Sequence, residues 1–171
     1  EIEAIRSSIE NTHLAFKYIE KVLKESEVNG ETILLNDEIL TSEFLKKEVD
    51  KILLGVDMVN SMGLIISSDK QASIPHHPGH GPIKANAPII CDIYPVNRTT
   101  GYFADMTRTY VKGAASKEME KIYNTVKASQ DAGISTIRPG VKASLVHDIC
   151  CRVFLDAGYD VGDKGFIHGT G

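Results

Sequence analysis

Apolar residues recur at helical spacing near the start of the chain and predict two helices there. In residues 2–23 they are separated by three, four or seven positions, as on one face of an amphipathic helix. Thr41 or Ser42 can cap a second helix, with Glu43 in its first turn. We expect the apolar face of this second helix to consist of Phe44, Val49, Ile52, Leu53 and Val56.

Two further helices are expected in the second half of the chain. Ser116 is a favourable N-cap for a third helix, which Arg138-Pro139-Gly140 would end. A fourth helix is expected over about residues 143–157, with Gly158 as its C-terminal stop. The apolar stripe of the third helix would be Met119, Ile122, Tyr123, Val126, Ile134 and Ile137.

Short apolar runs predict strands between and after these helices. Leu64-Ile65-Ile66 is typical of a short buried strand, whereas residues 33–36 are too few to assign. Residues 69–88 are rich in proline, glycine and histidine, which predicts a loop. A β-hairpin should follow with its turn in residues 95–101, and a last strand is expected near residues 166–167.

The order of the expected elements is helix, helix, strand, hairpin, helix, helix and strand. This order predicts an α+β protein in which helices cover an antiparallel sheet, with a two-fold repeat of that arrangement. The chain begins at Glu1 inside a helical pattern and stops at Gly171 directly after a Gly-rich sequence. We therefore expect residues 1–171 to be a fragment that is truncated at both ends.

Composition and charge exclude several classes of protein. The chain has the composition of a globular domain, and its formal net charge of -4 with scattered basic residues argues against a nucleic-acid partner. No apolar run is long enough to predict a membrane span. Cys91, Cys150 and Cys151 are too few for a disulfide framework and are interpreted as buried thiols, which favours a cytoplasmic location.

Two aspartates, Asp92 and Asp105, carry the clearest chemical signal in the chain. If the hairpin is centred on Arg98 and Thr99, the two aspartates lie directly opposite each other, with Cβ atoms about 4.5–5.5 Å apart. Two carboxylates at so short a distance repel each other unless a cation lies between them. A divalent metal or a pair of metals would serve as that cation. Alternatively, one or both aspartates are ordinary loop residues or pair with Arg108 or Lys112.

Several histidines and one cysteine are further candidates for chemistry. His76, His77 and His80 share one loop and could ligate a metal, although solvated loop histidines are more frequent. His168 has glycine-rich neighbours, which let the backbone approach a ligand closely. Cys91 should point away from the aspartate face and has no basic partner to lower its pKa, so we interpret it as a core residue.

Five short sequences stand out along the chain: Pro75-His76, Ile90-Cys91-Asp92, Asp105-Met106-Thr107-Arg108-Thr109, Ile137-Arg138-Pro139-Gly140-Val141 and Ile167-His168-Gly169-Thr170-Gly171. Taken in this order, they resemble the Xaa-Pro aminopeptidase and prolidase branch of the pita-bread metallopeptidases. The resemblance covers essentially the whole chain and implies the pita-bread fold. It implies that residues 1–171 are the N-terminal two-thirds of the catalytic domain, with residues 1–111 as its first half and 112–171 as the start of the second.

The resemblance also implies an activity and a site. Members of this branch hydrolyse peptide bonds before a proline at the second position, through a hydroxide held by two divalent metal ions such as Mn, Co or Zn. Asp92 and Asp105 match the two metal-binding aspartates. His76 matches a catalytic loop histidine near the scissile carbonyl, and His168 matches a second histidine on the substrate side. The implied partner is a peptide substrate, and the enzyme could form a homodimer.

The sequence departs from the family pattern in two respects. The aspartates are thirteen residues apart rather than the usual eleven, but two extra residues keep both carboxylates on one face of a hairpin. The doublet His76-His77 leaves open which histidine faces the site. The family's metal-binding histidine and two glutamates would follow Gly171, so the fragment alone is expected to be inactive.

Three other functions stay open on the same residues. Pita-bread domains also occur as catalytically inactive binding modules, but a dead site has no need of two packed carboxylates. Methionine aminopeptidases share the fold and usually have a different sequence around the second aspartate. A creatinase-like hydrolase that lacks metal ligands is disfavoured by the Asp92 and Asp105 pair.

Overall fold

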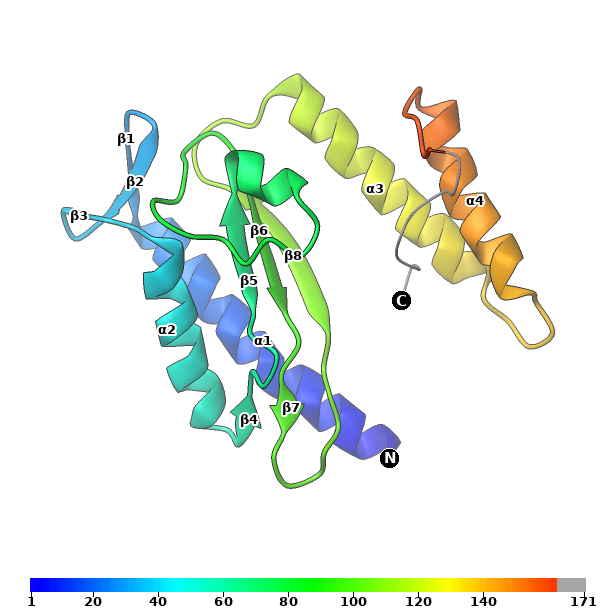
Figure 1. The fold of residues 1–171 in the computed structure, drawn as a ribbon, viewed down its shortest axis with the longest axis horizontal. Coiled ribbons are helices and arrows are strands. Elements are labelled where there is room, and N and C mark those ends of the chain that lie inside the picture. The colour runs from blue at the N-terminus through cyan, green and yellow to red at the C-terminus, as the bar shows by residue number, and fades with distance from the viewer. Residues whose placement is uncertain (163–171) are drawn as a thin grey trace. The chain divides into compact units, whose positions relative to one another are not determined.

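The computed structural model of the protein describes residues 1–162 and has two compact units, which are treated separately. The first unit is Glu1–Ala115 and the second begins at Ser116. The elements, in chain order (Figure 1), are α1 Ile2–Glu25, β1 Glu27–Asn29, β2 Thr32–Leu35, β3 Glu38–Ile39, α2 Ser42–Leu54, β4 Met58–Val59, β5 Ile65–Ser68, the 3-10 helix η1 Asp69–Ser73, β6 Pro88–Ile93, β7 Val96–Asn97, β8 Met106–Val111, α3 Lys117–Thr136 and α4 Ala143–Asp156.

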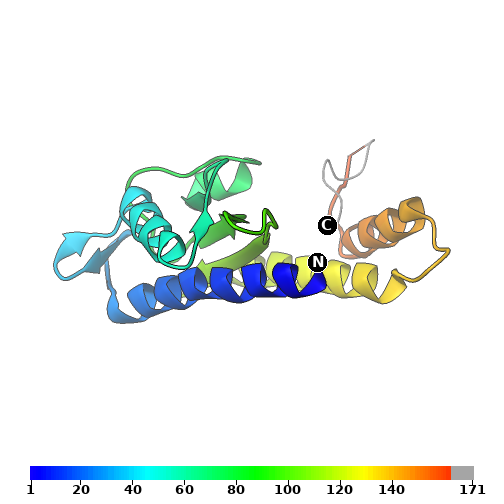
Figure 2. The same ribbon diagram turned by 90° about the horizontal axis from the view of Figure 1, so that it is seen from below.

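An antiparallel sheet of three strands, in the order β5-β6-β8, is the centre of the first unit. In β6, Ile89, Cys91 and Ile93 are fully buried and alternate with partly exposed residues, which is the period of a sheet with one face in the core. The long helix α1 runs along that buried face (Figure 2). The guanidinium of Arg108 in β8 lies 5.6 Å from the ring centroid of Phe16 in α1. The opposite face of the sheet is therefore the one that carries Asp92.

The two helices predicted for the first unit are confirmed, with one error in the second. Thr41 is the N-cap of α2, because its side chain accepts a hydrogen bond of 3.2 Å from the backbone N–H of Phe44. Leu45, Val49 and Leu53 repeat every four residues and are fully buried. The prediction that Phe44 belongs to the inward face is wrong, since it precedes that stripe by one position, about 100° around the helix, and is 38% exposed.

Three short segments also differ from expectation. Residues 33–36, which were not assigned, contribute to β2 of a small sheet with β1 and β3. Residues 69–88 are not a loop throughout, because they begin with the 3-10 helix η1 and end at Pro88, the first residue of β6. The hairpin continues beyond β6 into the short strand β7, which pairs with β4.

The second unit consists of α3 packed against α4, and both helices are confirmed. The side chain of Ser116 caps α3 by accepting the N–H of Met119 at 3.2 Å. The predicted apolar stripe does not make the contact with α4. Ser129 of α3 is buried and donates its hydroxyl hydrogen to the carbonyl of Cys150 at 3.2 Å, whereas Ile134 is 60% exposed. Small residues make this contact because they let two helix backbones approach closely.

Two remaining expectations concern the end of the chain and the membrane. The strand expected near residues 166–167 lies outside the described residues. Within residues 1–162, no helix has the length and apolar character needed to cross a bilayer.

Candidate metal centre

The pairing of β6 with β8 sets the position of the two aspartates. Asp92 lies opposite Thr107, and the isolated bridge between Val96 and Phe103 continues the same register around the hairpin. The prediction that Asp92 and Asp105 lie directly opposite each other is therefore wrong by two residues. The centre of the hairpin falls between Thr99 and Thr100 and not between Arg98 and Thr99. The tight turn begins at Asn97, whose backbone N–H donates to the carbonyl of Tyr102 at 3.0 Å.

A shift of two residues keeps both aspartates on the same face, so the main consequence of the prediction survives. Asp105 immediately precedes β8 and continues the register opposite Tyr94. The backbone N–H of Ala104 donates to the carbonyl of Pro95 at 3.0 Å. In an antiparallel ladder, the pairs on either side of such a bonded pair are the closely spaced ones. Asp92–Thr107 and Tyr94–Asp105 are pairs of that kind, and the two carboxylates are diagonal neighbours about 7–8 Å apart at Cα.

The carboxylate of Asp92 is held by its neighbour across the ladder. The hydroxyl of Thr107 donates a hydrogen bond of 2.6 Å to Oδ1 of Asp92. Asp92 is partly buried, whereas Thr107 is exposed. This contact fixes the direction of one carboxylate oxygen, Oδ1.

Among residues 1–162, no basic side chain forms an ion pair with the two aspartates of this face. Loss of hydration and, next, the charge of Asp92 raise the pKa of Asp105 above its ordinary value. Burial, then Asp92 and Asp105, raise the pKa of the Tyr94 phenol. The three groups thus lie close enough to interact electrostatically.

Such a site is chemically suited to a divalent cation. Carboxylate oxygens are hard ligands, and the diagonal spacing leaves room for two ions about 3.5–4 Å apart. Burial is the larger cause of the raised pKa of Asp105, and a cation would offset the smaller one, which is the charge of Asp92. The described part of the chain holds only a partial ligand set, since no group of three or more His, Cys, Asp or Glu side chains there could enclose a metal ion.

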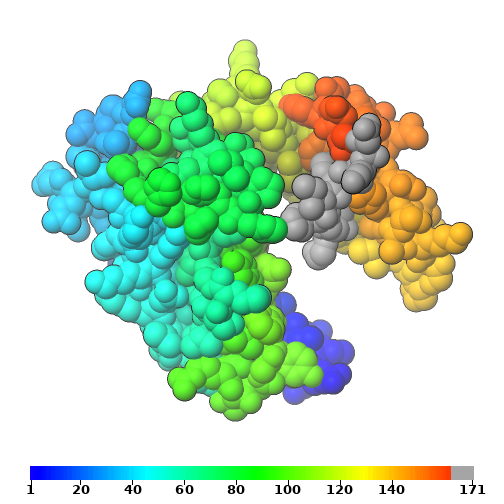
Figure 3. All heavy atoms as spheres, viewed as in Figure 1, coloured from blue at the N-terminus to red at the C-terminus, as the bar shows by residue number. Residues whose placement is uncertain are grey.

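The histidine loop between η1 and β6, which was predicted to contribute to the site, lies at the surface of the first unit (Figure 3). His76 is exposed and has a left-handed backbone with φ of +60°. His77 is partly buried, and its Nδ1 accepts the backbone N–H of Gly79 at 3.0 Å. That bond fixes the orientation of the His77 ring against its own loop. His77 therefore has a role in shaping the loop, and His76 is the more exposed member of the doublet.

The loop is anchored on the helix α2. The ammonium of Lys46 donates to the carbonyl of Gly79 at 2.7 Å. The two carboxylate oxygens of Glu43 each accept the backbone N–H of Gly81 at 3.0 Å, and this bond is the main cause that lowers the pKa of Glu43. Partial burial lowers the pKa of Lys46. These contacts fix the backbone on both sides of His80.

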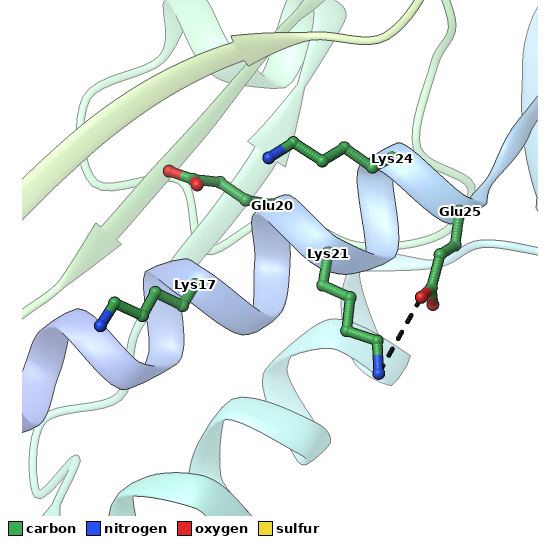
Figure 4. Close-up of a pocket in the computed structure, with 5 residues that line it drawn as sticks. All are labelled: Lys17, Glu20, Lys21, Lys24 and Glu25. Carbon is green, nitrogen blue, oxygen red and sulfur yellow. Dashed lines mark ion pairs between the residues drawn. The ribbon is translucent and has the colours of Figure 1, made fainter.

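A surface hollow of about 390 Å³ lies elsewhere in the first unit and does not belong to this site. It is formed by successive turns of α1 (Figure 4), and its lining residues are Lys17, Glu20, Lys21, Lys24 and Glu25. Glu20 accepts a hydrogen bond of 3.3 Å from the Tyr110 hydroxyl, which places this surface on the helix-covered side of the sheet. The aspartates lie on the other side.

Sequence reasoning located the aspartates but missed two neighbours that act on them. The period of two is sufficient to place Tyr94 and Thr107 on the aspartate face, but it indicates no role for either. The sequence contained no signal for Glu43 and Lys46, because their partners are backbone atoms about 35 positions away. His168, the other predicted catalytic residue, lies outside the described residues.

Comparison with known proteins identifies this fold as that of a metallopeptidase family. The pattern of metallopeptidase family M24 matches residues 3–171, and the chain belongs to this family. The Xaa-Pro dipeptidase of Lactobacillus delbrueckii subsp. lactis is 30% identical over 115 residues, which are 67% of this chain and 30% of that protein. Xaa-Pro aminopeptidase 1 of Streptomyces coelicolor is 30% identical over 158 residues, which are 91% of this chain and 30% of that protein.

Solved structures give the same fold. The prolidase from Pyrococcus furiosus superposes with a TM-score of 0.76 at 22% identity, over 98% of this chain and 45% of that one. The Xaa-Pro dipeptidase from Bacillus anthracis gives a TM-score of 0.78 at 19% identity, over 99% of this chain and 43% of that one. The α+β, pita-bread fold class is confirmed, and the chain spans less than half the length of these relatives.

Proposed function

We propose that this chain is part of a metal-dependent peptidase that hydrolyses Xaa-Pro bonds. The observation that carries the proposal is the pair of carboxylates, Asp92 and Asp105, on one face of a hairpin without a basic partner in residues 1–162. The names of the relatives supply the substrate class, which is a peptide with proline at its second position. In this proposal, residues 1–171 form the N-terminal two-thirds of the catalytic domain, divided near residue 111.

In this proposal each side chain has a distinct role. Asp92 and Asp105 would hold two divalent ions such as Mn, Co or Zn. Thr107 would orient the Asp92 carboxylate through its hydrogen bond. When bound, the ions would lower the pKa of a water molecule, so that it could attack the peptide carbonyl as hydroxide at neutral pH. His76, at the exposed turn of its loop, would hydrogen-bond the carbonyl oxygen as negative charge develops on it. His168 would bind on the substrate side.

The proposal is tested by the hydrolysis of Ala-Pro and of Ala-Ala by the full-length protein after removal of metal with EDTA. Ala-Pro should be cleaved only after Mn²⁺ or Co²⁺ is restored, and Ala-Ala should be cleaved much more slowly. Residues 1–171 alone should cleave neither dipeptide. Cleavage of Ala-Pro that survives metal removal would refute the proposal, and binding of metal without any hydrolysis would favour an inactive binding module.

A further inference from the structure

Thr107, the exposed threonine opposite Asp92, makes a hydrogen bond that its position at the surface of the sheet does not require. Thr107 lies on the solvent side of β8, where a polar residue needs no partner in the protein. Its hydroxyl nevertheless donates a hydrogen bond of 2.6 Å to Oδ1 of Asp92, which is short for two oxygen atoms. A hydrogen bond this short to a carboxylate is typical of a charge-assisted contact.

The register of the two strands favours this contact. Asp92 and Thr107 form one of the closely spaced pairs of the ladder, so their side chains start from neighbouring Cβ atoms. The next threonine on the same face, Thr109, lies opposite Ile90 and has no acceptor across the ladder. One face of β8 therefore presents two threonines in equivalent backbone positions, and only one of them reaches a candidate metal ligand.

We propose that Thr107 is a positioning residue of the metal centre, which holds the Asp92 carboxylate in the orientation that ligation needs. The inference rests on the proposed function, because it assumes that Asp92 is a ligand. Without the hydroxyl, the carboxylate would rotate freely about its χ2 angle and would turn away from Asp105, since the two negative charges repel. Part of the metal's binding free energy would then be spent on restoring the orientation.

The experiment is a titration of the metal-free, full-length protein with Mn²⁺, in competition with a fluorescent chelator. Thr107→Val, which keeps the shape and removes the hydroxyl, should weaken Mn²⁺ binding about tenfold, as loss of an outer hydrogen bond to a ligand does. Thr107→Ser should restore affinity close to that of the wild type. Thr109→Val is the matched control, with the same substitution on the same face, and should bind Mn²⁺ as the wild type does.

A spectroscopic readout separates orientation from stability. With Co²⁺ bound, Thr107→Val should change the visible absorption bands, whereas Thr107→Ser and Thr109→Val should leave them unchanged. Wild-type affinity and spectrum in Thr107→Val would overturn the inference, as would equal losses in Thr107→Val and Thr109→Val. If Asp92→Asn and Asp105→Asn also bind Mn²⁺ like the wild type, the proposed function fails together with the inference. If Asp92→Asn and Asp105→Asn lose Mn²⁺ binding but Thr107→Val does not, the proposed function stands and the inference alone is wrong.

Discussion

Replacement of Gly79 by alanine should destabilise the first unit through the histidine loop. Gly79 has φ of +80°, and a Cβ built on it would lie 1.8 Å from the carbonyl oxygen of Ile66 and 2.8 Å from Cα of Ser67. The obstacle is backbone of the buried strand β5, so no side-chain rotation can relieve it. The loop must move away from the strand by at least about 1 Å before an alanine fits.

The magnitude follows from the contacts that this movement breaks. The N–H of Ile66 donates to the carbonyl of Pro78 at 3.1 Å, and Lys46 donates to the carbonyl of Gly79 at 2.7 Å. Loss of these two bonds costs about 1 kcal/mol each. The left-handed backbone costs an alanine a further ~1 kcal/mol. We therefore expect Gly79→Ala to lower the free energy of unfolding by about 3 kcal/mol or more.

The assay is urea-induced unfolding followed by far-UV circular dichroism, with Gly81→Ala as the control. Gly81 also has a left-handed backbone, with φ of +72°, but no atom lies within 4 Å of its built Cβ. Gly81→Ala should therefore cost only the conformational ~1 kcal/mol. Equal destabilisation by the two substitutions would refute the argument that the loop is held by close backbone contact with Ile66.

Two further predictions concern the core and the helix pair. Burial and, to a smaller degree, the charge of Asp92 raise the pKa of the Cys91 thiol to about 12, so the folded state favours the neutral thiol. This stabilisation is complete below the unfolded pKa near 8.5 and is lost as pH rises towards 12, by up to about 1.4 kcal/mol per pH unit. Urea titrations from pH 8 to 11 should therefore show a steeper loss of stability in the wild type than in Cys91→Ala. Equal slopes of unfolding free energy against pH in the two proteins would contradict this prediction. In the second unit, Ser129→Leu should destabilise the α3–α4 pair by about 1–3 kcal/mol in thermal unfolding, whereas Ile134→Ser, at a position 60% exposed, should change stability by less than about 0.5 kcal/mol. A larger effect of Ile134→Ser would show that the exposed stripe, and not the small residues, holds the helices together.

Local signals in the sequence were sufficient to predict the helices. The caps Thr41 and Ser116 are read from residue type, and each side chain accepts the N–H three positions on, as expected. Which face of a helix is buried depends on its partners. The stripe of α3 that contains Ile122 has the right spacing for a core face, but α4 packs on the side that carries Ser129. Periodicity alone cannot distinguish these two faces when both are compatible with packing.

The candidate site shows the same limit in a different form. The period of two placed Asp92 and Asp105 on one face, and this result does not depend on the exact turn. Their register does depend on it, and the pairing of Asp92 with Thr107 was missed because the turn residues do not specify a two-residue shift. The anchoring of the histidine loop by Lys46 was beyond sequence reasoning, because the acceptor is a backbone carbonyl 33 positions away.

The central claim is that Asp92 and Asp105 bind metal together, and a crystal structure of the full-length protein grown with Mn²⁺ tests it most directly. Data collected at the manganese absorption edge should show strong anomalous density on the exposed face of the hairpin. The account predicts that this density lies within about 2.5 Å of a carboxylate oxygen of each aspartate. Manganese bound elsewhere, with no density between these two side chains, would contradict it.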